Sequence, residues 1–454
     1  MKKKVLPNLG VVILICFSLG ILISVNYCAA KLTNRFGWRF DMTSNQLYEL
    51  SEETKDVLRN LEQDVHIRVF SSEADFLPLA AEVLEQYKQY GNHRISVEYI
   101  DPYTQPTLID SYLQRGYSIE LGSIAVESDQ YTKVLQLSDM FVTNNDESAV
   151  QEIRCEQQLS GAIVYVAGTG SHTVQFITGH NESVSDGLLE LFQQSNYKTE
   201  ISALSMSGLD KDTDLVVIAD PTSDFSESEM EVLDTYMGGG GRLLIFMGPS
   251  SEALSRLKDF LTEWGIGIKD VVVAEPLQCT DSNPLSIVPV YTSHSINQYF
   301  AGNQLYLVMP SSRALDQLFV SQREIRTQKL LYSTDRAYDF QKKDGEKGPF
   351  TLAMTAEKKV DSGNARVVVI GSRGIYSDSL LKTENYANGK FLAQVMNWCT
   401  ETDSAVYIPS KIIGNHQISV TMSQILWMAG IFMLLLPMAV LVIGFIIYYR
   451  RRHS

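Results

Sequence analysis

The sequence predicts an α/β protein with one membrane-spanning helix near each end and a folded central part between them. Two observations carry this prediction. Long apolar runs without Asp, Glu, Lys or Arg lie near both ends of the 454-residue chain, and each reaches the roughly 20 residues that a helix needs to cross a bilayer. Between them, apolar runs of strand length alternate with amphipathic segments of helix length, which is typical of an α/β fold.

The two apolar runs are Val5–Val25 and Ile425–Tyr449. The cluster Lys2–Lys4 precedes the first run, and Arg450–Arg452 follows the second. Because positive charge stays on the cytoplasmic side of a membrane, we expect both termini inside and the central part outside the cytoplasm of a bacterial cell. A cleaved signal peptide ending near Cys28-Ala29-Ala30 is the alternative for the first run.

The charge balance bears on partners. The chain has 38 basic and 53 acidic residues. Six of the basic residues lie in the two terminal clusters, so the central part has 32 basic and 53 acidic residues and a net charge of −21. Such a surface disfavours nucleic acid as a partner. The five cysteines show no metal-binding spacing, so we expect mostly free, buried thiols, no metal and no cofactor.

Residues 31–150 are expected to form the first α/β domain. Ser51 is a suitable N-cap for a helix to about Leu61. Beyond it the expected order is β-α-β-α-β-β, that of a small thioredoxin-like unit. The elements are strand Val65–Phe70, helix Ala74–Tyr90, strand Ile95–Ile100, helix Thr107–Arg115, and the hairpin of Ser123–Val126 with Val134–Leu137.

A linking helix, Ile153–Ala167, is expected within residues 151–171, and a larger domain within residues 172–402. Continuous apolar strands separated by helices predict a parallel, doubly wound or flavodoxin-like sheet covered on both faces. Its strands are Val174–Thr178, Leu215–Ala219, Leu243–Met247, Leu305–Met309, Leu352–Ala356 and Val367–Ile370. Its helices are Val184–Ser195, Ser226–Met237, Leu254–Trp264 and Asn388–Cys399. Residues 1–30, 403–424 and 425–454 are then the first span, a linker, and the second span with its basic tail.

Ligands of such sheets bind at the carboxyl ends of the strands. The residues placed there are the candidate substrate-binding residues: Gly179, His180, Asn181, Glu182, Asp220, Pro221, Gly248, Ser250, Ser372 and Arg373. His180 and Glu182 form an H-x-E pair. This pair could be a metal or acid–base pair; alternatively, His180 orients a turn and Glu182 caps the next helix, which we favour because no third ligand is near in sequence.

Two patterns argue against other chemistry. Gly238–Gly241 lacks the GK[ST] ending of a phosphate loop and precedes a strand, so it predicts a helix-to-strand turn. After Leu243–Met247 the chain reads Gly-Pro-Ser-Ser-Glu, without the G-x-S-x-G or the cysteine of a nucleophile elbow. The sequence therefore predicts no catalytic residue.

A series of motifs in fixed order resembles the GldG-type auxiliary proteins of ABC transporters. The motifs are Asp41-Met42-Thr43, Tyr48–Ser51 with Thr54, Asp101-Pro102, Ala162-Ile163, Thr178–Glu182, Tyr236–Leu244, Ala365–Ser372, Asn397-Trp398 and Ile408–Lys411. The resemblance implies a larger domain related in fold to class I glutamine amidotransferases but without the catalytic cysteine. It also implies an ABC-2 type permease and a cytoplasmic ATPase as partners. Asn181 stands where the family usually has glycine.

The leading hypothesis is a non-enzymatic, membrane-anchored accessory subunit that binds or gates an exported glycan, lipid or peptide. No Walker motif occurs in the chain, so a partner would supply the energy. The alternatives are an extracytoplasmic glycan- or peptide-processing enzyme that uses His180, Glu182 and Asp220, and a structural protein of the cell envelope.

Overall fold

The computed structural model describes residues 24, 49–143, 150–168, 172–204, 208–210, 212–249, 254–303, 305–342, 345–381, 383, 386–402 and 405–413. The chain divides into two compact units, Met1–Lys411 and Ile412–Ser454. Nearly all described residues belong to the first unit, which holds two separate α/β parts. The domain boundaries predicted from the sequence stay predictions.

The predicted fold class needs a correction. No helix among the described residues is long and apolar enough to cross a membrane. The longest of them, such as α3 and α5, have 13 residues, whereas about 20 are needed. The segments expected to span, Val5–Val25 and Ile425–Tyr449, lie outside the described residues apart from residue 24. The fold class that the structure supports is α/β.

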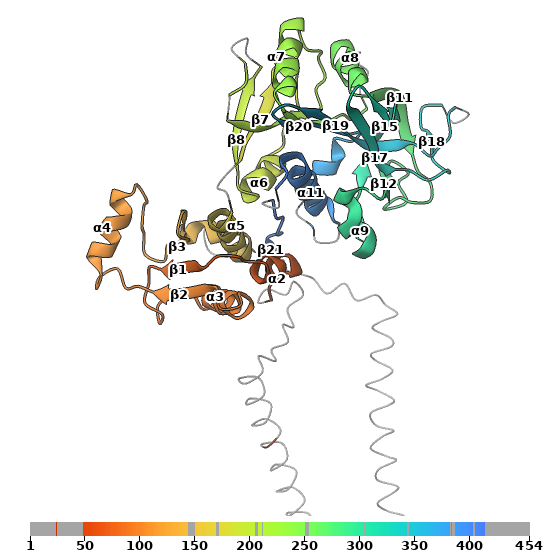
Figure 1. Ribbon diagram of the computed structural model, residues 1–454. Helices are drawn as coiled ribbons and strands as arrows, with labels where there is room; N and C mark the ends of the chain where they lie inside the picture. The colour runs from red at the N-terminus through yellow and green to blue at the C-terminus, as the bar shows by residue number, and fades with distance from the viewer. Residues whose placement is uncertain are drawn as a thin grey trace, which may run out of the picture. The chain divides into compact units, whose positions relative to one another are not determined.

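The first α/β part is a four-stranded sheet of order β2-β1-β3-β4 (Figure 1). The predicted β-α-β-α-β-β order and the hairpin are present, with β1 parallel to β2 and antiparallel to β3. As predicted, Ser51 caps the first helix, because its side chain accepts a hydrogen bond from Thr54 N. The elements are α2 (Glu52–Arg59), β1 (Val65–Val69), α3 (Pro78–Tyr90), β2 (Ile95–Tyr99), α4 (Pro106–Gln114), β3 (Ile124–Glu127) and β4 (Thr132–Leu135).

The predicted linking helix is α5 (Cys155–Ala167), and it does more than link. Its apolar residues pack into the same core as β1, β3 and α3, so this helix covers a face of the first sheet. A turn of 3-10 helix and two antiparallel strands precede it: η1 (Leu137–Met140), β5 (Phe141–Thr143) and β6 (Val150–Ile153).

The second α/β part is built on parallel strands in the order β8-β7-β9-β10-β20. Alternate residues of β9 enter different cores: Leu215 and Val217 lie in one, Val216 and Ile218 in the other. Burial of both faces explains why these strands read as continuous apolar runs. The strands are β7 (His172–Thr178), β8 (Tyr197–Ala203), β9 (Thr213–Ala219), β10 (Arg242–Phe246) and β20 (Gly363–Ile370).

Helices cover this sheet on both faces, as a doubly wound arrangement requires (Figure 1). Residues of α6 and α11 pack in one core, and residues of α7 and α8 pack in the other. All four lie close to the predicted ranges: α6 (Asp186–Gln194), α7 (Glu227–Gly238), α8 (Ser255–Glu263) and α11 (Asn388–Thr400).

The prediction of a wholly parallel sheet is wrong beyond β20. From β20 the sheet continues through β19, β15, β11 and β18, with β17 beside β19, and these pairings are antiparallel. Only Asp361 and Ser362 separate β19 from β20, and a two-residue connection can join antiparallel neighbours but not parallel ones. The strands are β11 (Ile266–Ala274), β15 (Ser312–Gln317), β17 (Ile325–Tyr332), β18 (Tyr338–Asp339) and β19 (Thr351–Val360).

Leu305–Met309, predicted as a core strand, contributes only Met309 to a strand, in the short pair of β12 with β14. The remaining elements are short. They are β12 (Ser286–Ile287), β13 (Val290–Tyr291), η2 (Ser295–Asn297), α9 (Gln298–Asn303), β14 (Met309–Pro310), β16 (Ser321–Gln322), η3 (Gly374–Tyr376), α10 (Asp378–Leu381) and β21 (Lys411–Ile412).

A buried histidine, His294, joins the loop between β13 and η2 to the antiparallel strand β19. His294 is 7% exposed, and its Nδ1 accepts a hydrogen bond from Ile296 N at 3.2 Å. Its Nε2 lies 3.3 Å from Thr355 Oγ1 on β19. Because Nδ1 accepts, the neutral ring is the form that fits, and burial lowers the pKa of His294 to about 4 from an ordinary 6.5.

This pKa predicts acid sensitivity. The folded state resists protonation of His294, so the stability that the neutral ring contributes is present above pH 6.5 and is lost as the pH falls towards 4. We expect a loss of about 2 kcal/mol across this window, after allowance for solvent screening. His294→Asn keeps an oxygen that can accept from Ile296 N but does not titrate. Urea unfolding at a series of pH values should show a flatter acid limb for this variant; equal limbs would contradict the assignment.

Candidate functional site

The switch point of the second sheet lies between β7 and β9. The chain leaves β7 through α6 to β8 on one side, and β9 pairs with the other side of β7. Ligands of doubly wound sheets bind outside the carboxyl ends of the strands at such a point. Here the two loops begin with left-handed backbone at Gly179, Asn181 and Asp220, with φ of 117°, 57° and 56°.

Backbone hydrogen bonds hold these two loops together. Thr222 N and Ser223 N donate to His180 O at 2.9 and 3.1 Å. In return Ser183 N donates to Ala219 O at 2.7 Å. The pairing of β7 and β9 therefore continues into their loops, which fixes where the side chains of His180 and Asp220 can lie.

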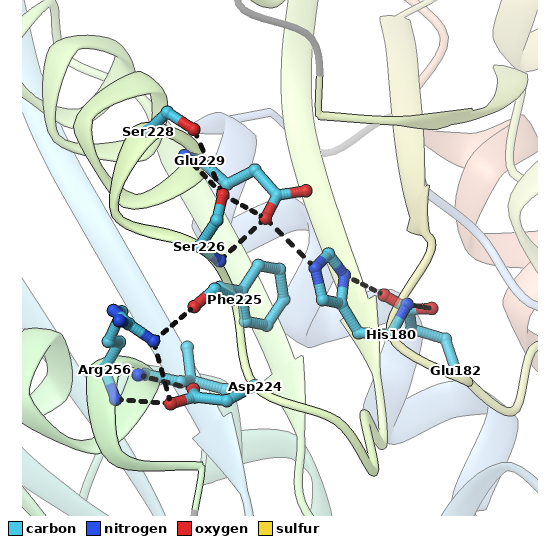
Figure 2. Close-up of polar contacts among 9 residues, drawn as sticks. His180, Glu182, Asp224, Phe225, Ser226, Ser228, Glu229 and Arg256 are labelled. Carbon is cyan, nitrogen blue, oxygen red and sulfur yellow. Dashed lines mark hydrogen bonds and ion pairs between the residues drawn. The ribbon is translucent and has the colours of Figure 1, made fainter.

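His180 fills the space between the loops (Figure 2). Its Nδ1 lies 3.1 Å from Glu182 Oε1, and its Nε2 lies 3.3 Å from Glu229 Oε2. The ring stacks on Phe225 with centroids 3.8 Å apart and planes 23° apart. Since the residue is only 5% exposed, it occupies the switch point more as a packing residue than as an open ligand.

Both carboxylates have structural tasks of their own. Glu182 Oε2 accepts from His180 N at 2.8 Å, which closes the turn. Glu229 forms a capping box with Ser226 at the start of α7. Burial would raise the pKa of Glu229, but hydrogen bonds from Ser226 and His180 outweigh it, so this pKa lies below its ordinary value.

The H-x-E pair is thus closer to a structural motif than to a metal or acid–base site. Each ring nitrogen of His180 already faces a carboxylate oxygen, from Glu182 on one side and Glu229 on the other. One detail of the structural prediction is wrong. Glu182 does not cap the next helix; Ser185 caps α6 by accepting from Leu188 N at 3.2 Å.

A second polar cluster surrounds Asp220. Its Oδ1 accepts from Gly248 N at 2.7 Å, and its Oδ2 lies 3.8 Å from Arg373 Nη1. A Cβ at Gly248 would lie 3.1 Å from Asp220 Oδ1, so glycine suits this close approach. Burial raises the pKa of the Asp220 carboxyl, and the Gly248 N–H and the Arg373 guanidinium only partly offset this.

Arg373 is the reachable cation of this cluster. Its side chain is 59% exposed, and its Nη1 also lies 3.4 Å from Ser183 Oγ. Arg313 on β15 is buried, and its charge likewise acts on Asp220. An exposed guanidinium of this kind can take up a carboxylate or phosphate group.

The predicted site residues therefore fall into two groups that share Ser183 and the loop backbone. Gly179, His180, Asn181 and Glu182 form the first. Asp220, Gly248 and Arg373 form the second, with Pro221 buried in the loop behind them. Ser372 points away from both and donates to Pro310 O at 2.5 Å. Ser250 lies outside the described residues. Their role in binding a ligand stays a prediction.

Three contributors were missed from the sequence. Glu229 follows Ser226 by three residues, the spacing of a capping box, but its second contact, with His180, depends on the fold of the sheet. Phe225 carried no signal. Arg313 lies on β15, whose residues SRALDQ mix polar and apolar side chains and were not recognised as a strand.

The cysteines agree with the prediction of free thiols within the described residues: Cys155 and Cys399 are buried, and Cys279 is half-buried. Burial raises the pKa of Cys155 and of Cys399 to about 12. Both thiols are therefore protonated at neutral pH and are poor nucleophiles.

A groove of about 720 Å³ lies at the opposite edge of the parallel strands. Its lining includes Asp210, Asp214, Glu231 and Arg242, together with the glycines that connect α7 to β10. Those glycines form the helix-to-strand turn predicted for Gly238–Gly241; Gly240 N, for example, donates to Met237 O at 3.1 Å. The turn has the role expected of it.

Comparisons with known proteins bear on the same strands and loops. Residues 171–287 match the family described as "ABC-type uncharacterized transport system". This match confirms the resemblance inferred from the sequence motifs for that segment, which contains β7, β9, β10 and the loops of the switch point. Residues 44–153 match a family described only as a domain of unknown function (DUF7088). None of the curated proteins matches the chain.

Solved structures resemble about half of the chain. The mmIFT52 N-terminal domain is 20% identical with a TM-score of 0.42, over 51% of this chain and 98% of that one. A putative ThuA-like protein from Parabacteroides merdae is 15% identical with a TM-score of 0.32, over 51% and 91%. A putative GMP synthase protein from Thermoplasma acidophilum is 11% identical with a TM-score of 0.30, over 52% and 96%. Likenesses of this size carry no conclusion about function.

The packing of His180 yields a stability prediction. His180→Ala removes the ring that stacks on Phe225 and leaves the Glu182 and Glu229 carboxylates without their shared partner. We expect a loss of about 2–4 kcal/mol in the free energy of unfolding. His66→Ala, at an exposed position of β1, is the matched control and should cost less than about 0.5 kcal/mol. Urea denaturation measures both; equal losses would show that His180 has no special structural role.

Proposed function

We propose that this chain is an accessory subunit of an ABC-type transport system, in which the second α/β part binds a transported substrate. The observation that carries the proposal is the family match over residues 171–287. That segment includes His180, Asp220 and Gly248, so the family match covers the loops after β7, β9 and β10, whereas Arg373 lies outside it.

The finer assignments are those that the resemblance to the GldG-type proteins implies. In this proposal an ABC-2 type permease carries out translocation and a separate ATPase hydrolyses ATP, which is consistent with the lack of a Walker motif in this chain. The substrate is an exported glycan, lipid or peptide that carries an anionic group. Arg373 would hold this group, since its guanidinium is exposed and only 3.8 Å from the Asp220 carboxylate that it would leave.

Catalysis is the weaker candidate. A glycan- or peptide-processing enzyme would need a base or an acid free to reach substrate. The two ring nitrogens of His180 pair with the carboxylates of Glu182 and Glu229, and Phe225 covers one face of the ring. This arrangement favours a binding subunit without its own reaction.

Co-purification tests the proposal. The chain, tagged and expressed in its own host, should bring down a multi-span permease and an ATP-binding subunit, identified by mass spectrometry. Arg373→Ala should leave this recovery unchanged, because the proposed substrate contact is separate from the partner contacts. An unrelated membrane-fraction protein tagged in the same way is the control. Recovery of the chain alone, even after chemical crosslinking in cells, would refute the accessory role.

The proposed place of the folded part is outside the cytoplasm, at the cell membrane. Cys279 allows a direct test, because it is half-buried while Cys155 and Cys399 are buried. A membrane-impermeant maleimide added to intact spheroplasts should label wild-type chain more strongly than Cys279→Ser. The same difference after lysis is the control for reactivity. A difference that arises only after lysis would place this part in the cytoplasm.

A further inference from the structure

Two segments far apart in sequence meet at one buried carboxylate. Glu156, in the first turn of α5, is 5% exposed. Its Oε1 accepts from Ser51 N at 2.6 Å and from Ser51 Oγ at 2.7 Å. Its Oε2 pairs with Lys411 Nζ at 3.0 Å. Ser51 caps α2 and Lys411 begins β21, so a single side chain joins these two distant segments.

The contacts around this carboxylate extend the connection. Lys411 Nζ also donates to Glu49 O, which joins the two ends directly. Gln157, the next residue of α5, donates from Nε2 to Ile408 O at 2.8 Å. Glu156 and Lys411 each expose less than a tenth of their surface, so the Glu156 carboxylate depends on the Lys411 ammonium for compensation of its charge.

The last residues before Lys411 are anchored at their other end to α11. Asn397 binds Ala405 through two hydrogen bonds: its Nδ2 donates to Ala405 O at 2.9 Å, and its Oδ1 accepts from Ala405 N at 2.8 Å. Tyr407 OH donates to Leu381 O of α10. Residues Ala405–Lys411, called the strap here, therefore run from the second α/β part to α5 of the first.

We propose that the strap is a conformational latch, which the Glu156–Lys411 ion pair holds closed and whose release frees both ends of the fold together. Beyond this ion pair, no hydrogen bond to Glu156 Oε2 is found in the described part of the chain. Loss of the ammonium leaves a buried, uncompensated carboxylate, which must turn towards water. As it turns, Glu156 Oε1 leaves Ser51.

The latch couples the strap to the start of α2, so that displacement of either segment loosens the other. Displacement of the strap removes the cation from Glu156, and the same carboxylate then no longer orients Ser51 at the start of α2. Displacement of the start of α2 removes two donors from the carboxylate and weakens its hold on Lys411. The two ends are thus coupled through one side chain, independently of whether the proposed transport role holds.

Hydrogen exchange of the full-length chain, followed by mass spectrometry, tests this coupling. Lys411→Met keeps an apolar side chain of similar length but removes the charge. We expect amide exchange to accelerate at least tenfold in the strap and also at Ser51, 360 residues earlier in the sequence, with no change in β9 and β10. Lys55→Met, which removes the ion-pair partner of the exposed Glu52 on α2, is the matched control and should change neither segment.

A second variant separates the charge effect from a general loss of structure. Glu156→Gln combined with Lys411→Met removes both charges, and the Gln oxygen can still accept from Ser51. In this double variant, exchange should stay fast in the strap but return to within threefold of wild type at Ser51. Exchange at Ser51 that is unchanged in Lys411→Met, or that is as fast in the double variant as in the single one, would overturn the proposal.

Discussion

The arrangement of the second α/β part depends on the burial of both faces of its parallel strands. β7, β9, β10 and β20 pair in register, and their alternate side chains enter two different cores. Apolar residues occupy most positions of these strands, and the polar clusters of the candidate site lie in the loops at the carboxyl edge. The histidine cluster and the Asp220 cluster lie at the carboxyl edge, and the acidic groove lies at the other.

At the switch point, the buried carboxylates of the loops also need partners that compensate their charge. A crevice between β7 and β9 would leave loop backbone and carboxylates poorly solvated. His180 fills the space, accepts two backbone N–H groups through its carbonyl oxygen and lies between two carboxylates. The solvent-exposed polar group of the site is instead the Arg373 guanidinium beside Asp220. This division explains why we assign packing to one group and recognition of an anion to the other.

The same rule governs the first α/β part. Glu156 is buried where the ends of the fold meet, and it is tolerated because Ser51 and Lys411 supply donors and charge. Buried ionic groups contribute little net stability compared with apolar residues, but loss of one partner is costly. Such a pair is therefore well suited to hold two segments in one state and to release them together.

The sequence by itself determined the elements whose pattern is local. Apolar runs such as Leu215–Ala219 and Leu243–Met247 and the cap at Ser51 depend on neighbours a few residues away. It also carried the resemblance to an ABC-type transport family and indicated that His180, Asp220, Gly248 and Arg373 follow strand ends. The sequence pattern did not predict the strands of mixed polarity, β11, β15 and β17. These segments become strands through antiparallel pairing at an otherwise open side of the sheet.

Only the tertiary structure decided which of these residues meet. Glu229 reaches His180 from 49 positions away, and Lys411 reaches Glu156 from 411 − 156 = 255 positions away; no local pattern encodes either contact. It also separated Ser372, which turns towards Pro310, from its neighbour Arg373, which turns towards Asp220. The physical reason is that burial and charge compensation are satisfied over the whole fold. A side chain therefore finds its partner by position in space, whereas strand and helix patterns are set by position in the chain.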